Sequence, residues 1–207
     1  VSPLLRAGEW KYRLAPCVLR YPCPDSNGLA GPATADVGGT PQPPVYVLDG
    51  ALPQPLLAHL LRVLEPQGTF WREHAYNEVA GSGENGYFSY LHALDGPPRV
   101  SLDLVIRRVR ELALPRFPEL AEATAAEWWA HCRPHPVGHQ LHFDSDDEGA
   151  DGARHPICSA VVYVDAPAGI GGPTLVTDQR LGDASLAARG WLAYPRTGRL
   201  AIFDASV

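Results

Sequence analysis

The apolar positions between residues 45 and 114 follow mainly a helical period. After a short strand-type run at 45–50, leucines recur every three or four residues between 53 and 66, where Pro66 stops the pattern. A second run at 101–114 places its apolar side chains on one helical face: Leu102, Val105, Ile106, Val109 and Leu112. The pattern predicts a helix over each of these two segments.

Three further segments complete this half of the chain. Residues 70–79 and 87–94 are expected to be strands, and the glycine-rich stretch 81–86 between them predicts a hairpin. Residues 120–132 are expected to form a helix that ends before Pro134.

The second half of the chain has a strand-like pattern. Short β-type runs are separated by glycine, proline and aspartate at 139–144, 157–165, 173–178, 190–195 and 198–207. Such spacing is typical of a small barrel or jelly roll. Helices followed by strands predict an α+β domain in which the two kinds of element are segregated.

Residues 1–44 differ in composition from the rest. Residues 24–44 are rich in proline and glycine and have no periodic pattern, so they are expected to form a linker or long loop. Residues 1–23 are an arm that either packs on the domain or belongs to a part outside this chain. We therefore place the domain at residues 45–207.

Composition and charge narrow the functional classes. The 207 residues are 45% hydrophobic and 19% charged, enough for a packed core. The net charge of −6 disfavours nucleic-acid binding, which depends on phosphate neutralisation. The densest basic cluster, Arg107, Arg108 and Arg110, is expected to be the exposed face of a helix.

The cysteines and the hydropathy bear on location. None of the four cysteines forms a C-x-x-C pair, so no structural zinc site is indicated, and Cys17 and Cys23 could be a disulfide or two thiols. No apolar run approaches the roughly 20 residues of a membrane span. The compartment stays open, and we expect a soluble protein, with a slight preference for an intracellular one.

His142 and Asp144 are the candidate chemical residues. Residues two apart on a strand point to the same face, so the strand expected at 139–144 would present this imidazole and carboxylate together. With one more histidine they would complete a facial triad that leaves the other face of an iron(II) ion open. Taken alone, the pair is better explained as a polar loop; the motifs downstream change that interpretation.

Four motifs follow in order. They are His142-Phe143-Asp144, the strand-type run at 159–165, the turn Gly171-Gly172 before 174–176, and the segment 194–203, whose pattern is similar to P-x-x-G-x-L-x-x-F. Residues 138–207 thereby resemble the iron(II)- and 2-oxoglutarate-dependent oxygenase superfamily, in its prolyl-4-hydroxylase-like branch. The resemblance implies a double-stranded β-helix (jelly-roll) core with N-terminal supporting helices.

The resemblance also implies roles for particular residues. His142 and Asp144 would be metal ligands for Fe(II). Tyr163, which shares a strand face with Ser159, would donate its hydroxyl to a carboxylate of 2-oxoglutarate, and Ser159 and Thr174 would line the cosubstrate pocket. Core packing is the alternative for Tyr163 and Thr174.

The implied reaction is the hydroxylation of a C–H bond with 2-oxoglutarate and O₂, with ascorbate as an auxiliary reductant. A peptidyl prolyl or similar protein substrate is favoured. The alternatives are a small-molecule hydroxylase of the same superfamily and a non-catalytic β-barrel binding module.

One departure from the family pattern concerns the distal ligand. No histidine follows His155, so the distal ligand is missing, and with it the basic residue that the family has beyond that ligand to bind the far carboxylate of 2-oxoglutarate. One explanation is a chain cut before its last core strands, inactive as it stands while its longer parent is active. Others are an inactive relative, or a different site completed by His131, His135, His139 or His155. We expect His155 to be exposed.

Overall fold

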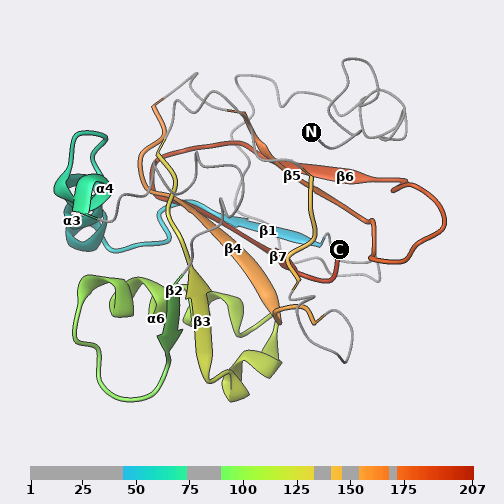
Figure 1. Cartoon of the computed structure of the whole chain (residues 1–207), viewed down its shortest axis with the longest axis horizontal. Coiled ribbons are helices and arrows are strands. Elements are labelled where there is room, and N and C mark those ends of the chain that lie inside the picture. The colour runs from blue at the N-terminus through green and yellow to red at the C-terminus, as the bar shows by residue number, and fades with distance from the viewer. Residues whose placement is uncertain (1–43, 74–89, 133–140, 146–153, 168–171) are drawn as a thin grey trace.

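The computed structural model describes residues 44–73, 90–132, 141–145, 154–167 and 172–207 (Figure 1). The helices are α3 (Gln54–Val63), α4 (Thr69–Glu73), α6 (Ser101–Ala113) and the 3₁₀ helix η2 (Pro118–Glu122). The strands are β1 (Val45–Leu48), β2 (Tyr90–Ala93), β3 (Ala125–Trp128), β4 (Cys158–Tyr163), β5 (Thr174–Thr177), β6 (Gly190–Ala193) and β7 (Arg199–Asp204).

The largest sheet has β7 at its centre. Its order is β1-β7-β4, and both pairings are antiparallel. In this register Phe203 of β7 lies between Val45 of β1 and Ser159 of β4. The last described strand therefore joins the first strand to the middle of the chain.

One face of this sheet packs on α3 and α6. Leu200 and Ile202 of β7 are completely buried on this face, together with Ala113 of α6. Alternate residues of the neighbouring strands join them: Tyr46, Leu48, Cys158 and Val162. The alternation is the period expected of strands with one face on the core.

The other face of the sheet is directed toward the β5–β6 hairpin. Because side chains alternate along a strand, Ser159, Val161 and Tyr163 of β4 lie on this face. The Tyr163 hydroxyl lies 3.0 Å from the main-chain oxygen of Ala193 in β6. The β1-β7-β4 sheet and the β5–β6 hairpin thus contact each other through the Tyr163 side chain of β4.

The turn before β7 depends on Gly198. Its φ of 77° lies in the left-handed region, which favours glycine. Its N–H donates to the Tyr163 main-chain oxygen (2.8 Å), and its own oxygen accepts from the Ala51 N–H (3.1 Å). A Cβ at this position would lie 3.1 Å from Leu57 Cδ2, so the turn also sets how closely α3 approaches.

Two expectations for the first half were wrong. Residues 70–73 of the expected strand 70–79 belong to the short helix α4. The Trp71 indole N–H lies within 3.2 Å of the main-chain oxygens of Leu64 and Glu65, just after α3. This contact bends the chain back onto α3. The expected hairpin between 70–79 and 87–94 is also wrong over the described residues, since β2 pairs with β3 instead.

The helix expected at 120–132 was also wrong. This segment contains the end of η2 and then the strand β3, whose Trp128 stacks on Tyr90 of β2 with ring centroids 4.7 Å apart. Alanine and glutamate favour helix locally, but the pairing with β2 and the stacked rings outweigh that preference.

The arginines of α6 connect elements rather than forming only an exposed face. Arg108 donates to the Ala51 oxygen (3.1 Å), and Arg110 donates to the oxygens of Leu120 and Ala121 (2.8 and 2.7 Å). Arg107 donates to the Gly96 oxygen. All three side chains are half-buried, which corrects the exposed-face expectation.

Most of the other expected elements are confirmed; the exception is the strand expected at 139–144, whose described residues are irregular. The first strand, the helices at 53–66 and 101–114, and the strands of the four last β-type runs all occur, and helices and small antiparallel sheets coexist. Within the described residues the sheets do not close into a barrel, and the jelly roll stays a prediction.

The linker at 24–44, apart from Pro44, lies outside the described residues, as do Cys17 and Cys23. None of the helices in the described ranges is long and apolar enough to cross a bilayer.

The Gly198→Ala variant tests the turn before β7. Gly182 also has a positive φ (89°), but a Cβ there would meet nothing within 4 Å, so Gly182→Ala reports backbone strain alone, about 1–2 kcal/mol. We expect Gly198→Ala to lower the free energy of unfolding by about 1–2 kcal/mol more, because Leu57 must move. Urea denaturation measures both variants, and equal losses would contradict the close approach of α3.

Candidate functional site

The side chains of His142 and Asp144 meet in the structure. His142 Nε2 lies 3.3 Å from Asp144 Oδ1, and the two side chains are 55% and 21% exposed. The strand expected at 139–144 is not found over its described part, because residues 141–145 are irregular. The two side chains therefore lie together as expected, but the strand from which this was predicted is absent from the described residues.

Asp144 is held by two further segments of the chain. Ser159 of β4 donates a hydrogen bond from Oγ to Asp144 Oδ2. The Nδ1 of His155 lies 3.0 Å from the main-chain oxygen of Asp144. His155 is half-buried, contrary to the exposed position expected from the sequence.

These contacts keep Asp144 ionised. The hydrogen bond from His142 is the largest cause that lowers the pKa of Asp144, and the bond from Ser159 acts in the same direction. Burial opposes them by raising the pKa of Asp144, and the charges of His142 and His155 lower it further. The Asp144 carboxylate and the partly exposed His142 imidazole beside it are groups of the kind that bind divalent metals, and they would supply two of the three ligands of a facial triad.

The distance between the two groups allows a shared metal ion. Two ligand atoms that lie about 2.1 Å from an octahedral ion, at right angles to each other, are about 3.0 Å apart. The observed 3.3 Å between Nε2 and Oδ1 is close to this value. Across the described ranges, however, no three His, Cys, Asp or Glu side chains are grouped to hold a metal. His135 and His139 lie outside those ranges.

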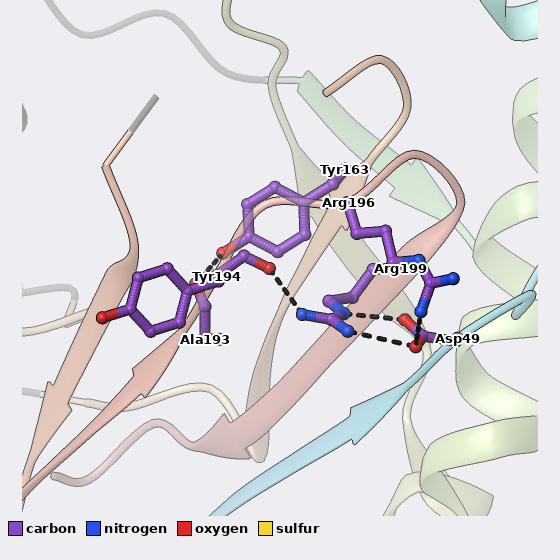
Figure 2. A network of polar contacts seen from close by, with 6 residues as sticks. All are labelled: Asp49, Tyr163, Ala193, Tyr194, Arg196 and Arg199. Atoms are coloured by element: carbon purple, nitrogen blue, oxygen red, sulfur yellow. Dashed lines mark hydrogen bonds and ion pairs between the residues drawn. The ribbon is translucent and has the colours of Figure 1, made fainter. Parts of the chain in front are cut away.

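The side chains of Tyr163 and Thr174 contact each other through their hydroxyl groups. Their hydroxyl oxygens are 2.6 Å apart. The Tyr163 hydroxyl also lies 3.0 Å from the Ala193 oxygen (Figure 2). A carbonyl can only accept, so Tyr163 donates to Ala193 and Thr174 donates to Tyr163. Burial is the main cause that raises the pKa of Tyr163.

The three predicted cosubstrate residues thus all have protein partners. Ser159 bonds Asp144, whereas Tyr163 and Thr174 connect β4 to the β5–β6 hairpin. To donate to a carboxylate of 2-oxoglutarate, Tyr163 would have to give up the Ala193 oxygen. The core-packing alternative for Tyr163 and Thr174 therefore gains direct support from these contacts.

A charged cluster beside Tyr163 was not anticipated. Figure 2 shows Asp49, just after β1, facing Arg196 and Arg199. Arg199 donates from Nε and Nη2 to the two carboxylate oxygens of Asp49 (2.7 and 3.0 Å), and Arg196 Nη1 lies 2.8 Å from Oδ2. Arg199 is the largest cause that lowers the pKa of Asp49. The two partners are 150 positions apart, so no local sequence pattern signals the pair.

Comparison of the chain with known proteins finds no relative of it. No family model matches the chain, and neither the curated proteins nor the solved structures contain a significantly similar one. Function must therefore be argued from the contacts above and from the motifs of the sequence.

Replacing Asp49 tests the charged cluster through its pH dependence. The folded-state pKa of Asp49 is lowered, so the carboxylate contributes stability above its unfolded pKa near 4, and this contribution disappears as pH falls through the folded value. We expect Asp49→Asn to cost about 0.5–1 kcal/mol at pH 7 and much less at pH 3. In an Arg199→Gln background the pH-dependent part should become smaller, because only Arg196 then remains beside the carboxylate. A loss that is the same at both pH values would contradict the prediction.

Replacing Tyr163 tests its role as a connector. Tyr163→Phe removes the bonds to Ala193 and Thr174, and we expect a loss of about 1–2 kcal/mol in the free energy of unfolding. Tyr46→Phe is the matched control, because the Tyr46 hydroxyl makes no hydrogen bond within the described residues. Thermal or urea unfolding measures both, and equal effects would remove the structural role of the Tyr163 hydroxyl.

Proposed function

We propose that this chain belongs to an iron(II)- and 2-oxoglutarate-dependent dioxygenase that hydroxylates a C–H bond, with a peptidyl prolyl or similar protein substrate. The observation that carries the proposal is the approach of His142 Nε2 to Asp144 Oδ1 beside the sheet face that bears Ser159. An imidazole and a carboxylate in this relation are two of the three ligands that such oxygenases use.

Each residue would have a distinct task. His142 would bind the metal through Nε2 and Asp144 through Oδ1, while Ser159 occupies Oδ2. When bound, iron(II) together with 2-oxoglutarate and O₂ supplies the oxidising chemistry. The Ser159 hydroxyl would keep its bond to Oδ2 when Nε2 and Oδ1 bind the metal, and this bond favours the deprotonated carboxylate that a metal ligand must be.

Tyr163 and Thr174 would bind a carboxylate of the cosubstrate. They lie on the same side of β4 as Ser159, and Tyr163 follows Ser159 by four residues, about 13 Å along a strand. On binding, the two hydroxyls would exchange their present contacts for bonds to a carboxylate. Without the cosubstrate, both hydroxyls keep their hydrogen bonds within the protein, so neither of the two is left without a partner.

A non-catalytic binding module is the second candidate. The observation in its favour is that the described residues supply two ligands and not a third. Two protein ligands hold a divalent ion weakly, because a full set of donors is needed to replace its water. The third ligand therefore decides between the two candidates.

Metal and cosubstrate binding test the proposal. We expect the complete product of the gene to bind Mn(II), standing in for iron(II), and then 2-oxoglutarate in calorimetry. With iron(II), 2-oxoglutarate and ascorbate in air it should also form succinate. Asp144→Ala should abolish both, whereas the control Asp183→Ala, on the loop between β5 and β6, should leave both unchanged.

Comparison of the complete product with residues 1–207 locates the third ligand. We expect weaker metal binding and no succinate from the 207-residue chain if the ligand is supplied from elsewhere. If neither protein binds Mn(II) or 2-oxoglutarate, the non-catalytic module replaces the oxygenase.

A further inference from the structure

We propose that Ser159 and His155 are positioning residues that hold Asp144 so that it offers one oxygen, Oδ1, to the metal. This inference rests on the proposed function, because it concerns how the same carboxylate binds. It reassigns Ser159, which the sequence placed in the cosubstrate pocket, to the carboxylate instead.

Ser159 is suited to this role by its place in the sheet. It lies on β4, opposite Phe203 of the central strand, so hydrogen bonds of the ladder fix its main chain. Its side chain is short, so few rotamers are open to its hydroxyl. The Ser159 hydroxyl is the donor and Asp144 Oδ2 the acceptor of the hydrogen bond between them.

His155 holds the same residue through the main chain. Its Nδ1 lies 3.0 Å from the Asp144 oxygen, and since a carbonyl only accepts, Nδ1 carries the hydrogen. Asp144 lies in an irregular segment, so no helix or strand fixes its orientation. The contacts from two distant segments, 11 and 15 residues away, do so instead.

The consequence concerns the number of coordination positions that Asp144 takes. With Oδ2 engaged by Ser159, the carboxylate binds through Oδ1 and leaves the adjacent position open for another ligand. Without the Ser159 hydroxyl, Oδ2 can turn to the metal, or the carboxylate can rotate away from it. The first change would fill the position that is otherwise open for another ligand, and the second would remove a protein ligand and weaken metal binding.

Metal titration of matched variants tests the role. Ser159→Ala removes the hydroxyl, Ser159→Thr keeps it, and Ser101→Ala is the control on α6, across the sheet. We expect Ser159→Ala to weaken Mn(II) binding, measured by electron paramagnetic resonance, by about 10–100-fold. Ser159→Thr should stay within about threefold of the unaltered protein, and Ser101→Ala should not differ from it.

A second pair of variants tests the main-chain contact. His155→Ala removes the donor, whereas the amide of His155→Asn can reach a similar position. We expect weaker Mn(II) binding, by about tenfold, for the alanine variant alone. This pair also keeps the inference testable if Ser159→Ala does not fold, which near-ultraviolet circular dichroism would show. The visible absorption of bound Co(II) should change in Ser159→Ala, because it reports coordination number and not stability.

The outcomes separate the inference from the proposed function. If the unaltered complete protein binds Mn(II) and both alanine variants bind it equally well, the positioning role is wrong and the oxygenase proposal stands. If the unaltered protein binds no Mn(II), the proposed function fails and the inference with it. Weaker binding in the alanine variants, restored in Ser159→Thr and His155→Asn, supports both.

Discussion

The pairing of β7 with both β1 and β4 is the interaction on which the rest of the described structure depends. Strand β7 carries Leu200 and Ile202, which are completely buried against the helices, and its main chain bonds to β1, at the start of the domain, and to β4. Removing β7 would leave β1 and β4 without their shared partner and expose the core beneath them. The position of every candidate site residue on β4 therefore depends on this strand.

Two features at the start of β7 secure that pairing. Gly198 provides the left-handed turn that brings its N–H to the Tyr163 oxygen and its oxygen to the Ala51 N–H. Arg199 then binds both oxygens of Asp49 after β1. A main-chain turn and a two-point ion pair thus join three segments at one end of the sheet, and Tyr163 extends the connection to the β5–β6 hairpin.

The candidate site combines a rigid element with an irregular one. Strand β4 gives Ser159 a fixed position, whereas His142 and Asp144 belong to a segment without helix or strand. Contacts to Ser159 and His155 supply the order that the segment lacks. This division is chemically useful, because a carboxylate held by its second oxygen offers the first in a constant direction.

The sequence by itself determined the elements whose apolar residues repeat with a clear period, namely α3, α6 and the strands β4 to β7, because burial on one face requires that period. It also singled out His142 and Asp144, although the strand expected to bring them together is not present in the described residues. Only the tertiary structure decided that residues 69–73 turn back as a helix under the Trp71 contacts, and that 125–128 pair with β2. The partners of Asp144 and of Asp49 were likewise decided there. These outcomes depend on atoms far apart in the chain, and local preferences of about 1 kcal/mol or less are outweighed by such contacts.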